Sequence, residues 1–157
     1  MPMAVTGVVG VDTWAHIEHP PTPAQVAEML APFRTNFVEA MRAFARNLFV
    51  PTSDPTLVEH VVTTMSAAPP PIAIGVREEV LGNMRQLQAG FQEVTAPKIL
   101  IYAESSRPPN IAAMQRYGIE GVPMSGIGHF MMLEDPQTFN RLLDEAVKKC
   151  LHMKAPQ

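Results

Sequence analysis

The sequence has little of several features that would identify a function directly. Its one cysteine, Cys150, has no partner for a disulfide within the chain of 157 residues. The 12 basic and 15 acidic residues form no long run of one sign, and the net charge is -3. A chain with this charge pattern offers no basic surface to a polyphosphate backbone. We therefore expect no nucleic-acid partner.

Long apolar runs are also absent. No stretch approaches the roughly 20 apolar residues that a membrane-spanning helix needs, and the first residues lack the basic region of a secretory signal. We expect a soluble, cytoplasmic protein with no membrane partner. Hydrophobic residues make up 46% of the chain, which is enough for one core at this length. We therefore expect one domain over 1–157, divided into a first strand and loop (1–19), a helical insertion (20–96) and a C-terminal β-α-β-α unit (97–157).

Three short apolar segments predict the strands. They are Val5–Val11, Lys98–Ala103 and the weaker segment Gly118–Met124. The 16 prolines divide the region between the first two strands into helices. Helices are predicted to begin near Pro23, Pro55 and Ile72, and the first of them is predicted to break at Pro32. Two further helices are predicted at 111–117 and from Pro136. This alternation predicts an α/β fold with a short, about three-stranded parallel sheet.

Two motifs carry a resemblance to a known family. The run Gly-His-Phe-Met-Met-Leu-Glu-Asp-Pro-Gln-Thr-Phe-Asn, from Gly128 to Asn140, resembles the histidine loop and final helix of α/β-hydrolases. Gly-Val-Asp-Thr-Trp, from Gly10 to Trp14, looks like the end of the strand that leads into the helical cap of that family. The resemblance implies that His129 is the general base of a catalytic triad. It also maps the acid of the family onto Glu104, which could equally be a solvated loop carboxylate.

One part of the family pattern is absent. The sequence contains no Gly-x-Ser-x-Gly nucleophile elbow, and its nearest serine-glycine pair, Ser125-Gly126, follows Pro123 where the elbow needs glycine. The resemblance therefore implies a C-terminal half of an α/β-hydrolase, a fragment or an independently started half, without its serine. A serine triad is unavailable within this chain.

A metal ion could supply the missing nucleophile. Asp12, His16 and His19 follow the first predicted strand, and a partial helical turn would place their side chains on one face. Imidazole and carboxylate ligands suit zinc, or less selectively manganese or cobalt, and zinc-bound water ionises near neutral pH. The sequence thus predicts zinc on Asp12, His16 and His19, with His129 nearby as ligand or base. Two histidines at this spacing are also common on solvated loops.

Three functions remain open at this level. The leading hypothesis is metal-dependent hydrolysis of neutral activated esters or phosphate triesters, since no arginine cluster accompanies the predicted site. The alternative is a catalytically inactive fragment that acts as a self-associating interaction module. A third reading is feeble acid-base esterase activity from His129 and Glu104 alone. Because the first strand would expose a sheet edge, we also expect a homodimer, with domain swapping as one route to it.

Overall fold

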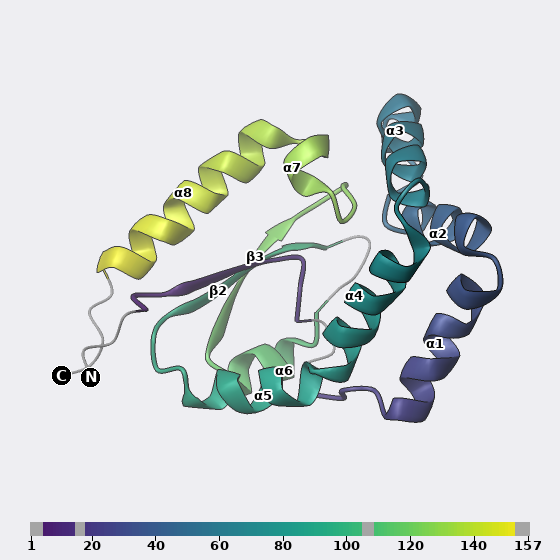
Figure 1. Cartoon of the computed structure of the whole chain (residues 1–157). Helices are drawn as coiled ribbons and strands as arrows, with labels where there is room; N and C mark the ends of the chain where they lie inside the picture. Colours follow the sequence, from purple (N-terminus) through teal and green to yellow (C-terminus); the bar gives the residue numbers. More distant parts are fainter. Residues whose placement is uncertain (1–4, 15–17, 105–108, 153–157) are drawn as a thin grey trace.

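The computed structural model describes residues 5–14, 18–104 and 109–152, and Figure 1 shows their arrangement. Three parallel strands form one sheet in the order β1-β2-β3, with β2 at its centre. The strands are β1 (Val8–Val11), β2 (Lys98–Ala103) and β3 (Ile119–Met124). The predicted α/β fold with a short parallel sheet is therefore confirmed, although β1 is shorter than the predicted strand.

Strand β2 forms the centre of the core because its side chains alternate between two covered faces. Ile101 packs on Met131 and Phe139, on the face covered by α7 (Met131–Glu134) and α8 (Pro136–His152). Leu100 points to the opposite face and packs on Phe91 and residues of α6 (Ile111–Arg116). Both side chains are at most 1% exposed. A strand buried on both faces needs the continuous apolar run that the sequence has here.

Between β1 and β2, the described residues form five helices. They are α1 (Pro23–Thr35), α2 (Phe37–Arg46), α3 (Pro55–Ser66), α4 (Pro70–Gly82) and α5 (Met84–Glu93). In Figure 1, α1 to α4 stand beside the sheet as a separate helical layer, whereas α5 returns beneath it. We call α1 to α4 the cap. No helix in the described ranges is long and apolar enough to cross a membrane.

Two helix boundaries differ from the sequence prediction. The predicted break at Pro32 is wrong, because α1 continues to Thr35 and the break falls at Asn36. Asn36 caps α2 by accepting a hydrogen bond from the Glu39 N–H at 3.4 Å, so its side chain begins the new helix. The single helix predicted from Ile72 to Phe91 is likewise wrong, since it is divided at Asn83 into α4 and α5.

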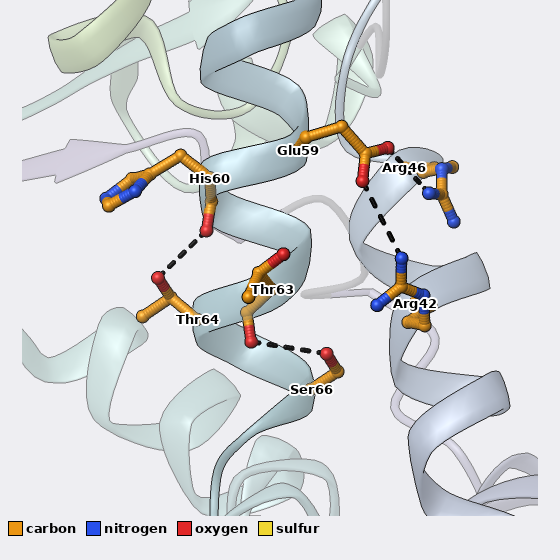
Figure 2. A network of polar contacts seen from close by, with 7 residues as sticks. All are labelled: Arg42, Arg46, Glu59, His60, Thr63, Thr64 and Ser66. Atoms are coloured by element: carbon orange, nitrogen blue, oxygen red, sulfur yellow. Dashed lines mark hydrogen bonds and ion pairs between the residues drawn. The ribbon is translucent and has the colours of Figure 1, made fainter.

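Charged side chains join two cap helices at the surface. Figure 2 shows Glu59 of α3 facing Arg42 and Arg46 of α2, at 3.6 Å and 2.6 Å respectively. All three side chains are at least one-third exposed, so each pair contributes at most about 1 kcal/mol. His60 points away from this cluster, and its backbone oxygen accepts a hydrogen bond from Thr64 Oγ1 at 2.8 Å.

Substitution at the centre of the sheet tests this core. We expect Ile101→Ala to lower the free energy of unfolding by about 2–5 kcal/mol, because it leaves a cavity between β2 and α8. The matched control is Ile111→Ala, since Ile111 is 53% exposed and should change that free energy by no more than about 0.5 kcal/mol. Urea denaturation followed by circular dichroism measures both. Equal effects of the two substitutions would contradict the assignment of β2 as the core strand.

Candidate active site

The turn after β1 places Asp12 at the carboxyl edge of the sheet. The Asp12 N–H donates to the Ile101 carbonyl at 2.8 Å, which continues the pairing of β1 with β2 by one residue. Asp12 and Trp14 have backbone φ angles of +41° and +63°, in the left-handed region that non-glycine residues rarely adopt. Each such residue costs on the order of 1–3 kcal/mol, and such residues occur often at functional sites. The chain therefore turns sharply while it keeps the Asp12 carboxylate against the sheet.

Trp14 is a packing residue that closes this turn. Its ring lies edge to face with Phe91, with 4.5 Å between the ring centroids. The same indole lies over Gly10 of β1, where an added Cβ would come within 2.5 Å of the ring. Only glycine at that position lets the indole approach the strand so closely. The packing of Trp14 thus helps to hold the left-handed turn that carries Asp12.

The central contact of the site joins Asp12 to His129. Asp12 Oδ2 lies 2.7 Å from His129 Nδ1, and Asp12 Oδ1 accepts a hydrogen bond from the Ala103 N–H at 2.9 Å. The Asp12 side chain is only 3% exposed, whereas that of His129 is 36% exposed. A buried carboxylate needs such partners because it has lost its hydration. Both oxygens of Asp12 are therefore engaged in fixing the imidazole to the sheet.

This contact determines which nitrogen of His129 can react. A carboxylate can only accept, so Nδ1 carries the hydrogen that Asp12 binds, and in the neutral ring Nε2 keeps its lone pair. Among the described residues, none is hydrogen-bonded to Nε2. The ring is partly open to solvent, so Nε2 can accept a proton or bind a metal ion.

Glu104, the acid that the family resemblance indicates, has a different partner. It follows β2, and its Oε2 accepts a hydrogen bond from Ser125 Oγ at 2.5 Å on the exposed side of the loop. Among the contacts of the described residues, none joins Glu104 to His129. The structure thus brings His129 together with Asp12 and not with Glu104.

The predicted metal ligands are only partly described. His16 lies outside the described residues, and His19 is exposed near the start of α1. Between them in sequence, Glu18 pairs with Arg116 and accepts a hydrogen bond from Asn110 Nδ2 at 3.1 Å. Within 5–14, 18–104 and 109–152, no three histidine, cysteine or carboxylate side chains are grouped closely enough to hold a metal ion. A zinc, manganese or cobalt site that includes His16 stays a prediction.

Three other reactive side chains lie away from His129. His60 is exposed on α3, and His152 Nδ1 lies 2.5 Å from the Lys148 backbone oxygen at the end of α8. Cys150 is buried against Ile99 and Ala146, and this burial raises the pKa of its thiol. A raised thiol pKa lowers the thiolate fraction at neutral pH, so Cys150 is poorly suited to act as a nucleophile.

The pairing of Asp12 with His129 is the part of the site that sequence reasoning missed. The sequence places both residues after strands of one parallel sheet, and the structure confirms that they meet at its carboxyl edge. The family pattern directs attention to Glu104, and the histidines after Asp12 suggest a ligand role for it. The usable signal was Asp12 itself, a carboxylate that directly follows a buried strand.

The Asp12 contact can be tested through the tautomer of His129. Asn at position 12 can donate to Nδ1, so Asp12→Asn should transfer the ring hydrogen to Nε2 in most molecules. The ¹⁵N chemical shifts of the imidazole distinguish the two tautomers. Glu104→Gln is the matched control and should leave the wild-type tautomer unchanged. If Glu104→Gln changes the tautomer and Asp12→Asn does not, the acid is Glu104, as the family resemblance implies.

Comparison with known proteins supports the fold. The chain is similar to a putative aryl esterase from Burkholderia cenocepacia, with a TM-score of 0.67 and 23% identity over 94% of this chain. It is also similar to a thermophilic esterase from Thermogutta terrifontis, with a TM-score of 0.65 and 20% identity, and to an esterase from Exiguobacterium antarcticum, with a TM-score of 0.65 and 14% identity, each over 92% of this chain. No protein-family model and no curated protein sequence matches the chain.

The similarity covers only part of these esterases. This chain spans 56% of the first two structures and 57% of the third. The similarity nevertheless includes 92–94% of this chain. The chain therefore has a partial α/β-hydrolase fold.

Proposed function

We propose that this chain hydrolyses neutral activated carboxylic esters, with His129 as general base and Asp12 as the residue that orients it. The observation that carries the proposal is the 2.7 Å contact between His129 Nδ1 and the buried Asp12 carboxylate, which leaves Nε2 available. The similar structures are esterases, one of them a putative aryl esterase, and this similarity supports an ester substrate.

The geometry allows a two-step role for His129. Its Nε2 removes a proton from the attacking O–H group and later returns that proton to the leaving oxygen. The Asp12 carboxylate stabilises the imidazolium that exists between these steps, without taking the proton itself. A positioned base of this kind contributes typically 10²- to 10⁴-fold in rate.

The nucleophile in this proposal is water, because the chain has no serine elbow and Ser125 Oγ donates to Glu104. Zinc is the proposed activator of this water, with His16 and His19 as its ligands, while His129 Nε2 is not bound to the metal and acts as the base. Bound zinc would lower the pKa of water and polarise the ester or phosphoryl oxygen.

Charge in the described residues supports a neutral substrate. Arg116 pairs with Glu18, and Arg34 pairs with Glu78, so these guanidinium groups are already engaged. A phosphate triester is neutral and reacts with metal hydroxide, so we include it with the carboxylic esters as a candidate substrate. Manganese or cobalt could replace zinc on the same ligands.

A second candidate function, self-association without catalysis, is favoured by two surfaces. Strand β1 pairs with β2 on one side, and within the described residues its other edge has no partner strand. Ile72, Val76 and Val80 are each more than half exposed along α4. A sheet edge and an exposed apolar stripe both favour association with another chain.

Chelation tests the zinc mechanism. Hydrolysis of a neutral activated ester and of a phosphate triester should fall at least about tenfold in a chelator and return when zinc is added back. His16→Ala should lower both the activity and the bound metal measured by mass spectrometry. Activity that is indifferent to chelator would eliminate the metal mechanism and leave water or an external serine as the nucleophile.

Removal of the base tests the proposed function itself. We expect His129→Ala to lower kcat/KM for the ester by roughly 10²- to 10⁴-fold, because proton transfer then depends on bulk water. His60→Ala is the matched control, since His60 is exposed on the cap and should change kcat/KM less than twofold. Equal activity of wild type and His129→Ala would leave self-association as the better account.

Light scattering after size-exclusion chromatography tests self-association. We expect a mass of about twice 17.2 kDa, because a two-fold dimer is the simplest closed assembly that covers a sheet edge. Val76→Lys on α4 and Val9→Pro on β1 distinguish the two surfaces, since each disrupts one of them. A stable wild-type monomer at micromolar concentration would count against the dimer.

A further inference from the structure

A carboxylate joins the cap to the loop that carries His129. Glu134, the last residue of α7, accepts a hydrogen bond from the Gly128 N–H through Oε1 at 2.8 Å. Its other oxygen, Oε2, accepts a hydrogen bond from Ser53 Oγ at 2.6 Å. Ser53 lies in the turn between α2 and α3, where its Oγ also accepts from the Val50 N–H at 3.1 Å. Glu134 thus binds one group on each side of the boundary between cap and histidine loop.

The backbones of the two segments meet beside this carboxylate. The His129 N–H donates to the Leu48 carbonyl at 2.7 Å, so a cap residue holds the backbone of the proposed base. Gly128 is buried there, and an added Cβ would lie 2.4 Å from Leu48 O and 2.8 Å from Phe49 Cα. These are backbone atoms that cannot rotate away. The residue before His129 must therefore be glycine for the two segments to approach this closely.

One aromatic pair joins the two segments. The rings of Phe49 and Phe130 lie 5.1 Å apart between centroids. On the other side a cavity of about 420 Å³ separates cap residues such as Leu57 from loop residues such as Ile127, and Ser53 and Glu134 lie on its wall. Beside this cavity, the hydrogen bonds of Glu134 to Ser53 and Gly128 bridge the boundary.

We infer that Glu134 is a positioning residue for His129. It holds the cap turn 48–53 to the Gly128 backbone, and this keeps the imidazole Nδ1 within hydrogen-bond distance of the Asp12 carboxylate. The catalytic meaning of this role rests on the proposed function, but the orientation of the ring does not. Glu134 touches neither ring nitrogen, so it acts through the backbone on which His129 is mounted.

The test uses the tautomer of His129 as a readout that is independent of hydrolysis. Glu134→Ala should convert the Nδ1-protonated ring into a mixture of tautomers, seen in the ¹⁵N shifts, because the loop no longer holds Nδ1 against the Asp12 carboxylate. Glu134→Gln should keep the wild-type tautomer, since its amide oxygen still accepts from the Gly128 N–H. Glu145→Ala, which removes an exposed carboxylate from α8, controls for the loss of charge.

Kinetics provide the second readout. Glu134→Ala should lower kcat for the ester roughly 10- to 100-fold with little change in KM, as expected for a misplaced base. If the variants have altered tautomers while neither they nor the wild type hydrolyse the ester, the role of Glu134 is upheld and the proposed function is rejected. A folded Glu134→Ala protein with the wild-type tautomer and kcat would overturn the inference.

Two further variants keep the inference testable if Glu134→Ala does not fold. Ser53→Ala removes only the cap side of the link and should produce a smaller shift in the same direction. Gly128→Ala should disturb the tautomer through the clash with Leu48, whereas Gly90→Ala in α5, where an added Cβ meets nothing within 4 Å, should not. Wild-type tautomers in both Ser53→Ala and Gly128→Ala would reject the role.

Discussion

The burial of one carboxylate constrains the whole arrangement around His129. Asp12 is 3% exposed in its side chain, so hydrogen-bond donors of the protein must replace the water that the carboxylate has lost. One donor is the Ala103 N–H at the end of β2, and the other is the imidazole Nδ1. The parallel register that places Val11 beside Ile101 puts the Ala103 N–H within reach of the carboxylate. The pairing of β1 with β2 and the orientation of His129 therefore depend on one another.

Local strain is the cost of this placement. Asp12 and Trp14 both adopt left-handed backbone conformations, and a bulky residue such as Trp tolerates these poorly. The packing of Trp14 on Phe91 and its close approach to Gly10 provide compensating contacts. Since Phe91 belongs to α5, the helix that returns from the cap to the sheet, the packing that stabilises the turn at Asp12 depends on the position of this helix.

The sequence predicts the parts of the fold that depend on local patterns. The apolar run of β2 and the caps at Thr22 and Asp54 mark their elements, because each signal acts within a few residues. Pro32 predicts a helix break at the wrong residue, because it lies in the last turn of α1 and the helix continues past it to Thr35. The contact of Asp12 with His129 spans 117 positions in sequence and depends on a left-handed turn that no local pattern specifies. The sequence therefore predicts where the site lies but not which carboxylate serves it.

The proposed hydrolysis has two requirements that His129 does not meet by itself. Ester hydrolysis needs a nucleophile and a positive or dipolar group that stabilises the developing oxyanion, and the Asp12–His129 pair supplies neither. A metal ion would supply both at once, whereas a serine from elsewhere would still need an oxyanion hole beside it. Nε2 is the ring nitrogen that does not contact Asp12, and the His129 side chain is 36% exposed, so either source could reach it. The first source needs an ion and its ligands, whereas the second must bring a strand and a loop to the sheet.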